Sequence, residues 1–223
     1  MLTKKDIRFS LDQMTEMFPD AHCELIHKNP FELVIATLLS AQTTDVNVNR
    51  VTADLFQKYS TPEDYLAVSL EALQQDIRSI GLYRTKANNI QKLCRTLLDD
   101  FEGVVPKTRE ELMQLAGVGR KTANVVMSVA FGEPAIAVDT HVERVAKRLG
   151  FCRWKDSVMQ VEETLMKKIP QEEWSDTHHR LIFFGRYHCK SQRPNCGECP
   201  LLIVCREGKK RMRKLEKQQK TVN

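Results

Sequence analysis

The stretch LAGVGRKTANVV, residues 115–126, places glycines at positions 117 and 119 before a basic pair and an apolar helical segment. Glycine-rich turns at helix starts bind phosphate, because unpaired backbone N–H groups and the helix dipole favour an anion there. A nucleotide-binding P-loop needs a glycine, four residues and then Gly-Lys-Ser/Thr, all after a strand. Arg120 separates Gly119 from Lys121, and position 114 is glutamine. The spacing therefore excludes a P-loop.

The same stretch is typical of a helix–hairpin–helix, whose turn binds one phosphate of a nucleic-acid backbone without reading a base. We expect this motif over about residues 108–131, with a first helix from Thr108 to Ala116. The residues expected at the phosphate are those of the turn and of the second helix start: Gly117, Val118, Gly119 and Arg120. On these residues alone, an ordinary glycine-rich turn between two helices remains an alternative.

Lys121 and Asp139 are the candidate catalytic residues. Lys121 lies at the edge of the apolar face of its helix, where it is either a surface lysine with a buried stem or a nucleophile. A lysine nucleophile must be neutral, which requires desolvation or positive neighbours such as Arg120. Asp139 follows the run AIAV and precedes a helix, the pattern of an N-cap. A carboxylate at a helix N-terminus stays ionised, so Asp139 is also placed to support a positive charge or to transfer a proton.

Four of the seven cysteines lie close together near the C-terminus with the spacing C-x6-C-x2-C-x5-C. They are Cys189, Cys196, Cys199 and Cys205. Four thiolates in so short a segment can enclose one centre, and both zinc and a four-iron cluster accept four cysteines. Structural zinc sites usually have two short Cys-x2–4-Cys arms, whereas only the second spacing here is short. The pattern favours a [4Fe–4S] cluster, with structural zinc as the alternative.

The elements that must position these residues are almost all helical. Helix starts carry their expected caps, such as Thr3, Asn29 before Pro30, and Thr61 before Pro62. A further helix is expected to run from Ser69 to Gly81, and AIAV is the only short β-like run. The sequence therefore predicts an all-α fold of about ten helices joined by short loops.

Composition and charge narrow the class of protein. The chain has 223 residues, 42% hydrophobic and 28% charged, as expected of a globular protein with a real core. No apolar run is long enough to span a membrane, and the N-terminus lacks the apolar core of a signal peptide. We therefore expect a cytoplasmic protein that does not bind membranes. Residues 206–223 carry eight basic and two acidic side chains; such a basic tail is either a solvated end or a source of weak, sequence-independent attraction to nucleic acid.

These motifs together resemble the endonuclease III family, bifunctional DNA glycosylases and AP lyases of base excision repair. The resemblance rests on LAGVGRKTANVV, VDTHVERVAKRLG and the cysteine spacing, and on LLSAQTTDVNVNR (38–50) and IGLYRTKANNI (80–90). It covers roughly residues 30–205, and all the motifs occur in the family's order.

The resemblance implies two helical domains with a DNA-binding cleft between them. One is a multi-helix bundle over residues 23–133 that includes the hairpin. The other combines residues 1–22 with 134–205 and carries the [4Fe–4S] cluster, while residues 206–223 form the basic tail.

The resemblance also implies roles for particular residues. Lys121 matches the Schiff-base nucleophile and Asp139 the essential carboxylate. Gln42 and Leu82 match the residues that probe or fill the base stack. Independently of the resemblance, Lys190 and Arg193 are candidates for phosphate contacts, because they are cations on the cysteine loop. The implied substrate is duplex DNA with oxidised pyrimidines or abasic sites. We expect a monomer, associated with the nucleoid if the source is a prokaryote.

Two other functions remain in view. One is that of the related adenine glycosylases that act opposite oxidised guanine. They lack a lysine at the position of Lys121, and they place a catalytic glutamate in the helix that here reads VIATLLSAQTTD, which contains no glutamate. Both differences count against this function. A non-catalytic helix–hairpin–helix module would need neither Lys121 nor Asp139. A single-strand binder is disfavoured, because aromatic residues make up only 7% of the chain.

Overall fold

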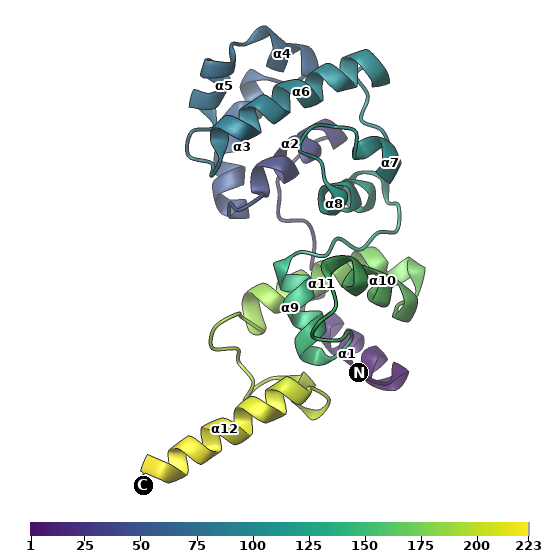
Figure 1. Ribbon diagram of the computed structural model, residues 1–223, viewed down its shortest axis with the longest axis vertical. Helices are drawn as coiled ribbons and strands as arrows, with labels where there is room; N and C mark the ends of the chain where they lie inside the picture. Colours follow the sequence, from purple (N-terminus) through teal and green to yellow (C-terminus); the bar gives the residue numbers. More distant parts are fainter. Residues whose placement is uncertain (223) are drawn as a thin grey trace. The chain divides into compact units, whose positions relative to one another are not determined.

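The computed structural model describes the backbone of residues 1–222 and the side chains of residues 1–218. Asn223, the last residue of the predicted basic tail, lies outside the described residues. All regular secondary structure in the described part is helical (Figure 1). The chain forms two compact units: unit 1 comprises residues 1–22 and 136–223, and unit 2 comprises residues 23–135.

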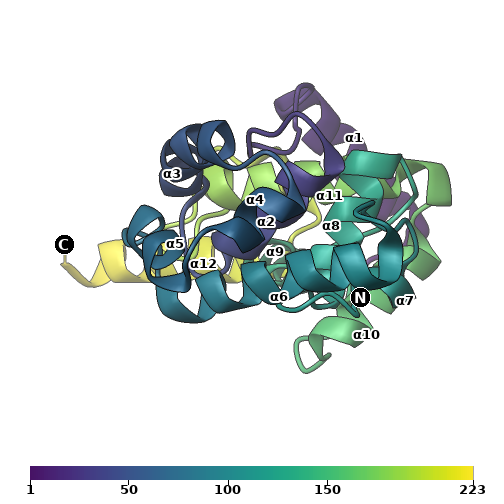
Figure 2. The same cartoon turned by 90° about the horizontal axis from the view of Figure 1, so that it is seen from above.

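Unit 2 is built around α2, Pro30–Ser40, in which every residue from Phe31 to Leu39 is buried. A helix that is apolar on all sides must be covered on all sides, and α2 packs against α3, α6 and α8. Figure 2 shows α6 crossing the unit, and α4 and α5 pack on α6. The remaining helices of this unit are α3 (Asp45–Lys58), α4 (Pro62–Ala67), α5 (Leu70–Asp76), α6 (Tyr83–Phe101), α7 (Arg109–Leu112) and α8 (Arg120–Phe131).

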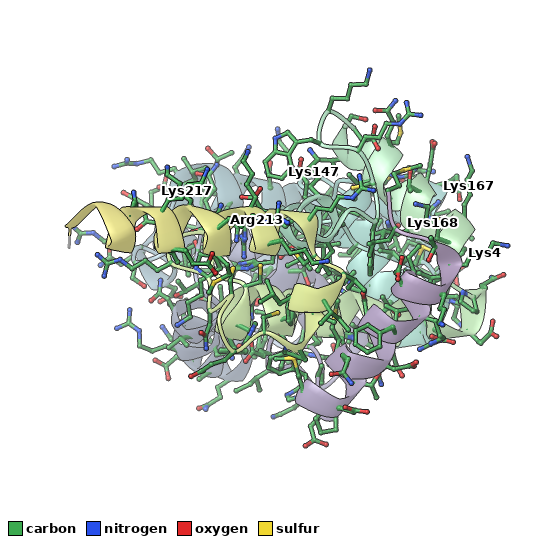
Figure 3. All side chains as sticks on the ribbon, turned by 90° about the horizontal axis from the view of Figure 1, so that it is seen from below. Lys4, Lys147, Lys167, Lys168, Arg213 and Lys217 are labelled. Carbon is green, nitrogen blue, oxygen red and sulfur yellow. The ribbon has the colours of Figure 1, made fainter. Side chains whose placement is uncertain are left out.

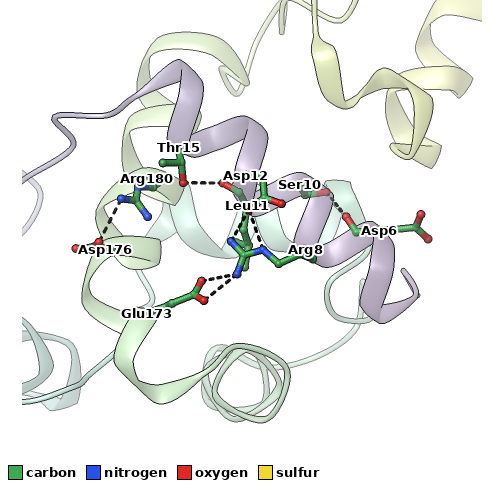
Figure 4. A network of polar contacts seen from close by, with 9 residues as sticks. All are labelled: Asp6, Arg8, Ser10, Leu11, Asp12, Thr15, Glu173, Asp176 and Arg180. Carbon is green, nitrogen blue, oxygen red and sulfur yellow. Dashed lines mark hydrogen bonds and ion pairs between the residues drawn. The ribbon is translucent and has the colours of Figure 1, made fainter.

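Unit 1 has its own core around α9, Thr140–Leu149. The buried residues of α9 recur at helical spacing, at Val142, Val145, Ala146 and Leu149. The surrounding elements are α1 (Lys4–Met17), α10 (Val158–Lys168), α11 (Trp174–Phe183), a π-helical segment (Phe184–His188), 3-10 turns (Gln171–Glu173 and Pro200–Ile203) and α12 (Arg206–Val222). Arg8 of α1 binds Glu173 through both carboxylate oxygens at 2.8 Å, which joins the two chain segments of this unit (Figure 4).

The predicted caps are present, but two helices are shorter than expected. Thr3, Asn29 and Thr61 each accept a backbone N–H at the start of their helix. The helix expected to reach Gly81 ends at Asp76, where tighter turns bury Ile77 and Ile80.

The first hairpin helix was expected to reach Ala116 but ends at Leu112, because the chain then continues with hydrogen bonds to the third residue back.

The run AIAV was expected to be too short and too isolated to pair, and it is buried without forming a strand. The C-terminal tail differs from a simple interpretation of the sequence. The basic tail is not a frayed end: residues 206–222 form α12. Its first turn is held by bonds to the cysteine loop, from Lys209 N–H to Cys205 O and from Gly208 N–H to Cys205 Sγ.

Candidate functional site

The hairpin turn has the geometry of an anion-binding helix start. Gly117 adopts a left-handed backbone with φ of 81°, and a Cβ there would lie 2.9 Å from Leu38 Cδ1. Val118 is buried and anchors the turn in the core. Gly119 is extended, is the N-cap of α8 without any side-chain cap bond, and has open space where a Cβ would project. The first N–H groups of α8 are therefore uncapped at a position that a ligand can approach closely.

Lys121 lies in the first turn of α8 and is exposed. Arg120 precedes it at the helix start and is half-buried. Asn124, expected on the same strip as Lys121, is buried and its Oδ1 accepts a hydrogen bond from Arg109 Nε at 2.8 Å. This bond fixes the two hairpin helices to each other, so the backbone that carries Lys121 is held rigidly.

Gln42 and Leu82 lie in two adjoining turns of unit 2. Both have a left-handed backbone, with φ of 56° and 59°, which costs a non-glycine residue about 1–3 kcal/mol and concentrates at functional sites. Asn47 Nδ2 donates to Ser79 O at 3.1 Å across the two turns. Gln42 is exposed and Leu82 is 60% exposed. The two strained turns therefore present one polar and one apolar side chain to solvent.

Lys86 is a residue of this region that the sequence reasoning missed. It is only 4% exposed, and its Nζ donates to Leu39 O at 2.9 Å and to Ala41 O at 2.6 Å. Burial lowers the pKa of its ammonium. Because Lys86 lies one turn after Leu82 in α6 and binds the backbone before Gln42, it holds both turns. The signal was present in the sequence, since residues 86, 90, 93 and 97 share one face of α6 and the other three are apolar and buried.

Asp139 in unit 1 is the N-cap of α9. Its Oδ1 accepts from the N–H groups of His141 and Val142, both at 2.8 Å. The buried run of residues 135–138 leads directly to Asp139, which fixes where the half-buried carboxylate emerges. Burial lowers the pKa of the neighbouring His141 imidazole, and Asp139 opposes that shift.

Two arginines of α9 hold the start of the cysteine loop, and neither was anticipated. Arg144 Nη2 donates to Gly185 O at 2.8 Å and also bonds to Cys189 O. Arg148, 8% exposed, donates to Lys190 O at 2.7 Å and to Ser191 O at 2.8 Å. A Cβ on Gly185 would lie 2.9 Å from His141 Cβ, so the π-helical segment packs closely against α9. The helix that presents Asp139 thus also positions the backbone around Cys189.

The four predicted ligand cysteines lie within one loop region of unit 1, and all four are free thiols. Burial raises the pKa of Cys199 to about 11, and the other three cysteines add to the rise, so the four sulfurs lie within electrostatic range of one another. Two N–H groups point at sulfur: Arg148 Nη1 to Cys189 Sγ at 3.5 Å and Gly208 N–H to Cys205 Sγ at 3.2 Å. Within residues 1–218, no three His, Cys, Asp or Glu side chains are arranged to hold a metal ion.

Lys190 and Arg193 lie in the irregular part of the same loop, and both are exposed. Arg193 has a left-handed backbone with φ of 47°. Arg148 donates to the carbonyl oxygen of Lys190, so α9 fixes the backbone of the loop while its cationic side chains face solvent.

The predicted site residues are divided between the two units. Unit 2 contains Gln42, Leu82, the hairpin and Lys121, and unit 1 contains Asp139, the cysteines, Lys190 and Arg193. The pairing of Lys121 with Asp139 remains a prediction.

Comparison with known proteins places this arrangement in a family. Residues 35–171 match the model of the HhH-GPD superfamily of base excision DNA repair proteins. Endonuclease III of Bacillus subtilis is 70% identical over 96% of this chain and 98% of its own length. Endonuclease III of Escherichia coli K12 is 49% identical over 87% of this chain and 92% of its own.

Solved structures of related enzymes support the same family. A trapped endonuclease III–DNA covalent intermediate has a TM-score of 0.94 at 73% identity, covering 95% of this chain and all of that one. A thermostable thymine-DNA glycosylase, at 25% identity, still has a TM-score of 0.81 over 92% of this chain and 98% of its own. No helix in the described part of the chain has both the length and the apolar character to cross a membrane. The chain belongs to the HhH-GPD superfamily of base excision DNA repair proteins and, within it, to the endonuclease III family of DNA glycosylases with AP lyase activity.

Proposed function

We propose that this protein excises oxidised pyrimidines from duplex DNA through a Schiff base on Lys121 and then cleaves the strand 3′ to the site, acting as a monomer. The observation that carries the proposal is the position of Lys121, exposed in the first turn of α8 immediately after an uncapped, side-chain-free helix start. A phosphate at that helix start would bring the neighbouring sugar within reach of the Lys121 amine in the same turn. The relative captured as a covalent intermediate with DNA supports the same chemistry.

Substrate binding begins at the hairpin, where Gly117, Val118, Gly119 and Arg120 would hold a backbone phosphate. Open space at the missing Cβ of Gly119 lets the phosphate approach the N–H groups. Gln42 and Leu82 would enter the gap left by the flipped nucleotide. An exposed leucine on a strained turn is costly without a partner, and an apolar side chain can occupy an unstacked base step.

The chemistry then follows from Lys121 and Asp139. Neutral Lys121 Nζ attacks C1′ of the damaged nucleotide, the glycosidic bond breaks and the base leaves with the bonding electrons. After Nζ loses a proton, the C1′–O4′ bond breaks, O4′ takes up a proton and an imine joins Nζ to C1′. Removal of a C2′ proton then breaks the C3′–O bond by β-elimination, and the 3′ phosphate leaves. Because Lys121 is exposed, its desolvation must come from the bound DNA. Asp139 would stabilise the positive charge that develops on the sugar, since two backbone donors hold its carboxylate in place.

We assign a [4Fe–4S] cluster to Cys189, Cys196, Cys199 and Cys205. The donor set is four thiols and no other ligand type, and two N–H groups already point at two of the sulfurs, as hydrogen bonds to cluster sulfurs do. Structural zinc usually has two short Cys-x2–4-Cys arms, whereas only the spacing between Cys196 and Cys199 is short here, which supports the cluster over zinc. When bound, it would brace the loop that presents Lys190 and Arg193 to phosphates.

The test is to incubate the protein with a duplex containing an abasic site and to add borohydride, which reduces an imine to a stable adduct. Wild type should yield a covalent protein–DNA product that Lys121→Gln does not form. Arg95→Gln, an exposed cation of α6 outside the proposed site, serves as the control and should form the adduct normally. The absence of adduct from wild-type protein that binds the duplex would exclude the Schiff base.

A further inference from the structure

Helix α12 presents a continuous row of cations that the proposed chemistry does not use. At 100° per residue, Arg206, Lys210, Arg213 and Lys217 fall within 40° of one line along the helix, and Lys209 and Lys214 flank them. All six side chains are exposed and line one open groove of about 560 Å³. We call these six residues the cationic stripe.

Acidic residues are few in the described part of α12. Glu207 accepts a hydrogen bond from Arg211 Nε at 2.8 Å, and Arg211 is not part of the stripe. Glu216 is the only other acidic residue among residues 206–218. Six cations therefore face solvent along about 16 Å of helix at 1.5 Å per residue, which is a strong local positive potential.

The opposite side of α12 is fixed to unit 1. Gly208 is buried, and a Cβ there would lie 3.1 Å from Leu202 Cδ1. Cys205, just before the helix, bonds to Arg148 O through its thiol. Since one side of the first turn is packed, the stripe must point outward. Figure 3 shows Arg213 and Lys217 along α12, on a face of the molecule that also shows Lys4 and Lys167.

The cationic stripe is separate from Asp139. The base of α12 contacts Arg148, near the C-terminal end of α9, whereas Asp139 is the cap at the N-terminal end. Nine residues of helix separate these positions, about 13 Å along the axis. Within unit 1, α12 extends away from the other helices (Figure 1). The stripe is therefore not a continuation of the surface around Asp139.

The chemistry of the stripe indicates what it binds. A row of flexible cations with no buried donor suits an extended polyanion better than a small anion, and duplex DNA carries one charge per about 1.7 Å of its axis. Residues 206–223 contain no aromatic side chain on which single-stranded bases could stack. Leu215 is the only exposed large apolar residue of the described part of α12, which is too little for a helix that lies on a membrane.

We propose that the cationic stripe is a second, sequence-independent binding surface for duplex DNA, able to hold a duplex while the lesion site is occupied by another. Such a surface would keep the enzyme on undamaged DNA during search and let it pass between neighbouring segments. The proposal goes beyond the lyase function proposed above and relies on it only for DNA as the partner.

The test uses enzyme covalently trapped by borohydride on a short, biotinylated abasic duplex, to which a fluorescent undamaged duplex is added. Wild type should retain the second duplex on the beads at low salt. The stripe variant combines Lys209→Gln, Lys210→Gln, Arg213→Gln and Lys217→Gln, because glutamine keeps helix propensity while removing charge. It should retain at least about tenfold less, since each phosphate contact contributes to binding and to its salt dependence.

A matched control removes four exposed cations elsewhere, with Lys92→Gln, Arg95→Gln, Arg153→Gln and Lys155→Gln. It should retain the second duplex like wild type, and all three proteins should trap the abasic duplex equally. Equal loss in both variants, or no second duplex on trapped wild type, would overturn the proposal, as would stronger retention of anionic vesicles or single strands than of duplex. A failure to trap any abasic duplex would count against the lyase proposal instead, and the second-duplex comparison would then be made with free protein.

Discussion

Replacing Lys86 by methionine tests whether the two strained turns of unit 2 are held for function. Methionine keeps the length and the apolar stem of the side chain but removes the ammonium. That ammonium donates to Leu39 O, Ala41 O and, at 3.3 Å, Thr43 Oγ1. All three acceptors lie in the chain immediately around Gln42, so the substitution releases that turn directly.

The size of the effect follows from these contacts. A buried acceptor that loses its partner costs about 1–3 kcal/mol, and Leu39 O and Ala41 O both lose theirs. Against this, burial disfavours the ammonium itself, as its lowered pKa shows, and methionine relieves that cost. We expect a net loss of about 2–4 kcal/mol in the free energy of unfolding, within the range for a broken buried network. The protein should therefore remain folded near room temperature.

The effect on activity should depend on the substrate. In the proposed roles of Gln42 and Leu82, displacing either side chain weakens the flipped state, and about 1.4 kcal/mol of lost stabilisation corresponds to tenfold in rate. A paired damaged base must be unstacked, whereas an abasic site is flipped at less cost. Under single-turnover conditions, Lys86→Met should lose about tenfold in excision of an oxidised thymine and about threefold or less in cleavage of a preformed abasic site, given that difference in flipping cost.

Lys92→Met is the control, because Lys92 is an exposed lysine of the same helix. It should change neither the unfolding free energy nor either rate. Wild-type excision by a folded Lys86→Met protein would refute the argument that Lys86 positions the two turns. An equal loss on both substrates would reduce the role of Lys86 to general stability.

Four other substitutions give separable outcomes. Asp139→Asn keeps both cap bonds, so we expect stability within about 1 kcal/mol of wild type by chemical unfolding, but excision at least about 100-fold slower. Gly117→Ala should cost about 1–3 kcal/mol because of its left-handed backbone and its contact with Leu38. Gly119→Ala should leave stability within about 0.5 kcal/mol yet weaken DNA binding in a filter assay; unchanged affinity would remove the phosphate from that helix start. Burial lowers the pKa of His179 in the folded protein below its ordinary value of 6.5. As the pH falls below 6.5, the unfolded chain binds a proton at this histidine more readily than the folded protein does, and His179 then lowers the free energy of unfolding. His179→Gln should therefore lose less stability than wild type between about pH 7.5 and pH 5.5, as measured by urea unfolding at both values.

The helices and most of their starts were predictable because their causes are local. A serine, threonine, asparagine or aspartate that caps a helix lies within three residues of the group it caps, so the cap of α9 at Asp139 follows from the printed order of residues. The ends were harder to predict. The helix expected to reach Gly81 stops at Asp76 because Ile77 and Ile80 are buried in the core of unit 2, and core contacts between distant segments do not show in local sequence.

The candidate site also has a part that the sequence predicts and a part that it does not. Lys121, Asp139 and the cysteines can be proposed from residue type and spacing, since reactive groups have few chemical substitutes. The burial of Lys86 could be inferred from its place on the apolar face of α6, but the hydrogen-bond partners of Lys86 and Arg144 could not, because both donate to backbone carbonyl oxygens. A carbonyl oxygen belongs to every residue type, so its partner leaves no trace in the sequence. The strained backbones of Gln42 and Leu82 were hidden for the same reason, since neither residue type favours φ above zero.

The contacts of α9 join two features that the sequence presents as separate motifs. Asp139 caps the N-terminus of this helix, and Arg144 and Arg148 follow at one-turn intervals, each bonded to the backbone near Cys189. A shift of the cysteine loop would therefore break charged hydrogen bonds to the helix whose first turn fixes the Asp139 carboxylate. The proposed catalysis would require that carboxylate to be held within about half an ångström. The cysteine loop thus contributes to the proposed chemistry through the position of α9, without contact with the reacting atoms.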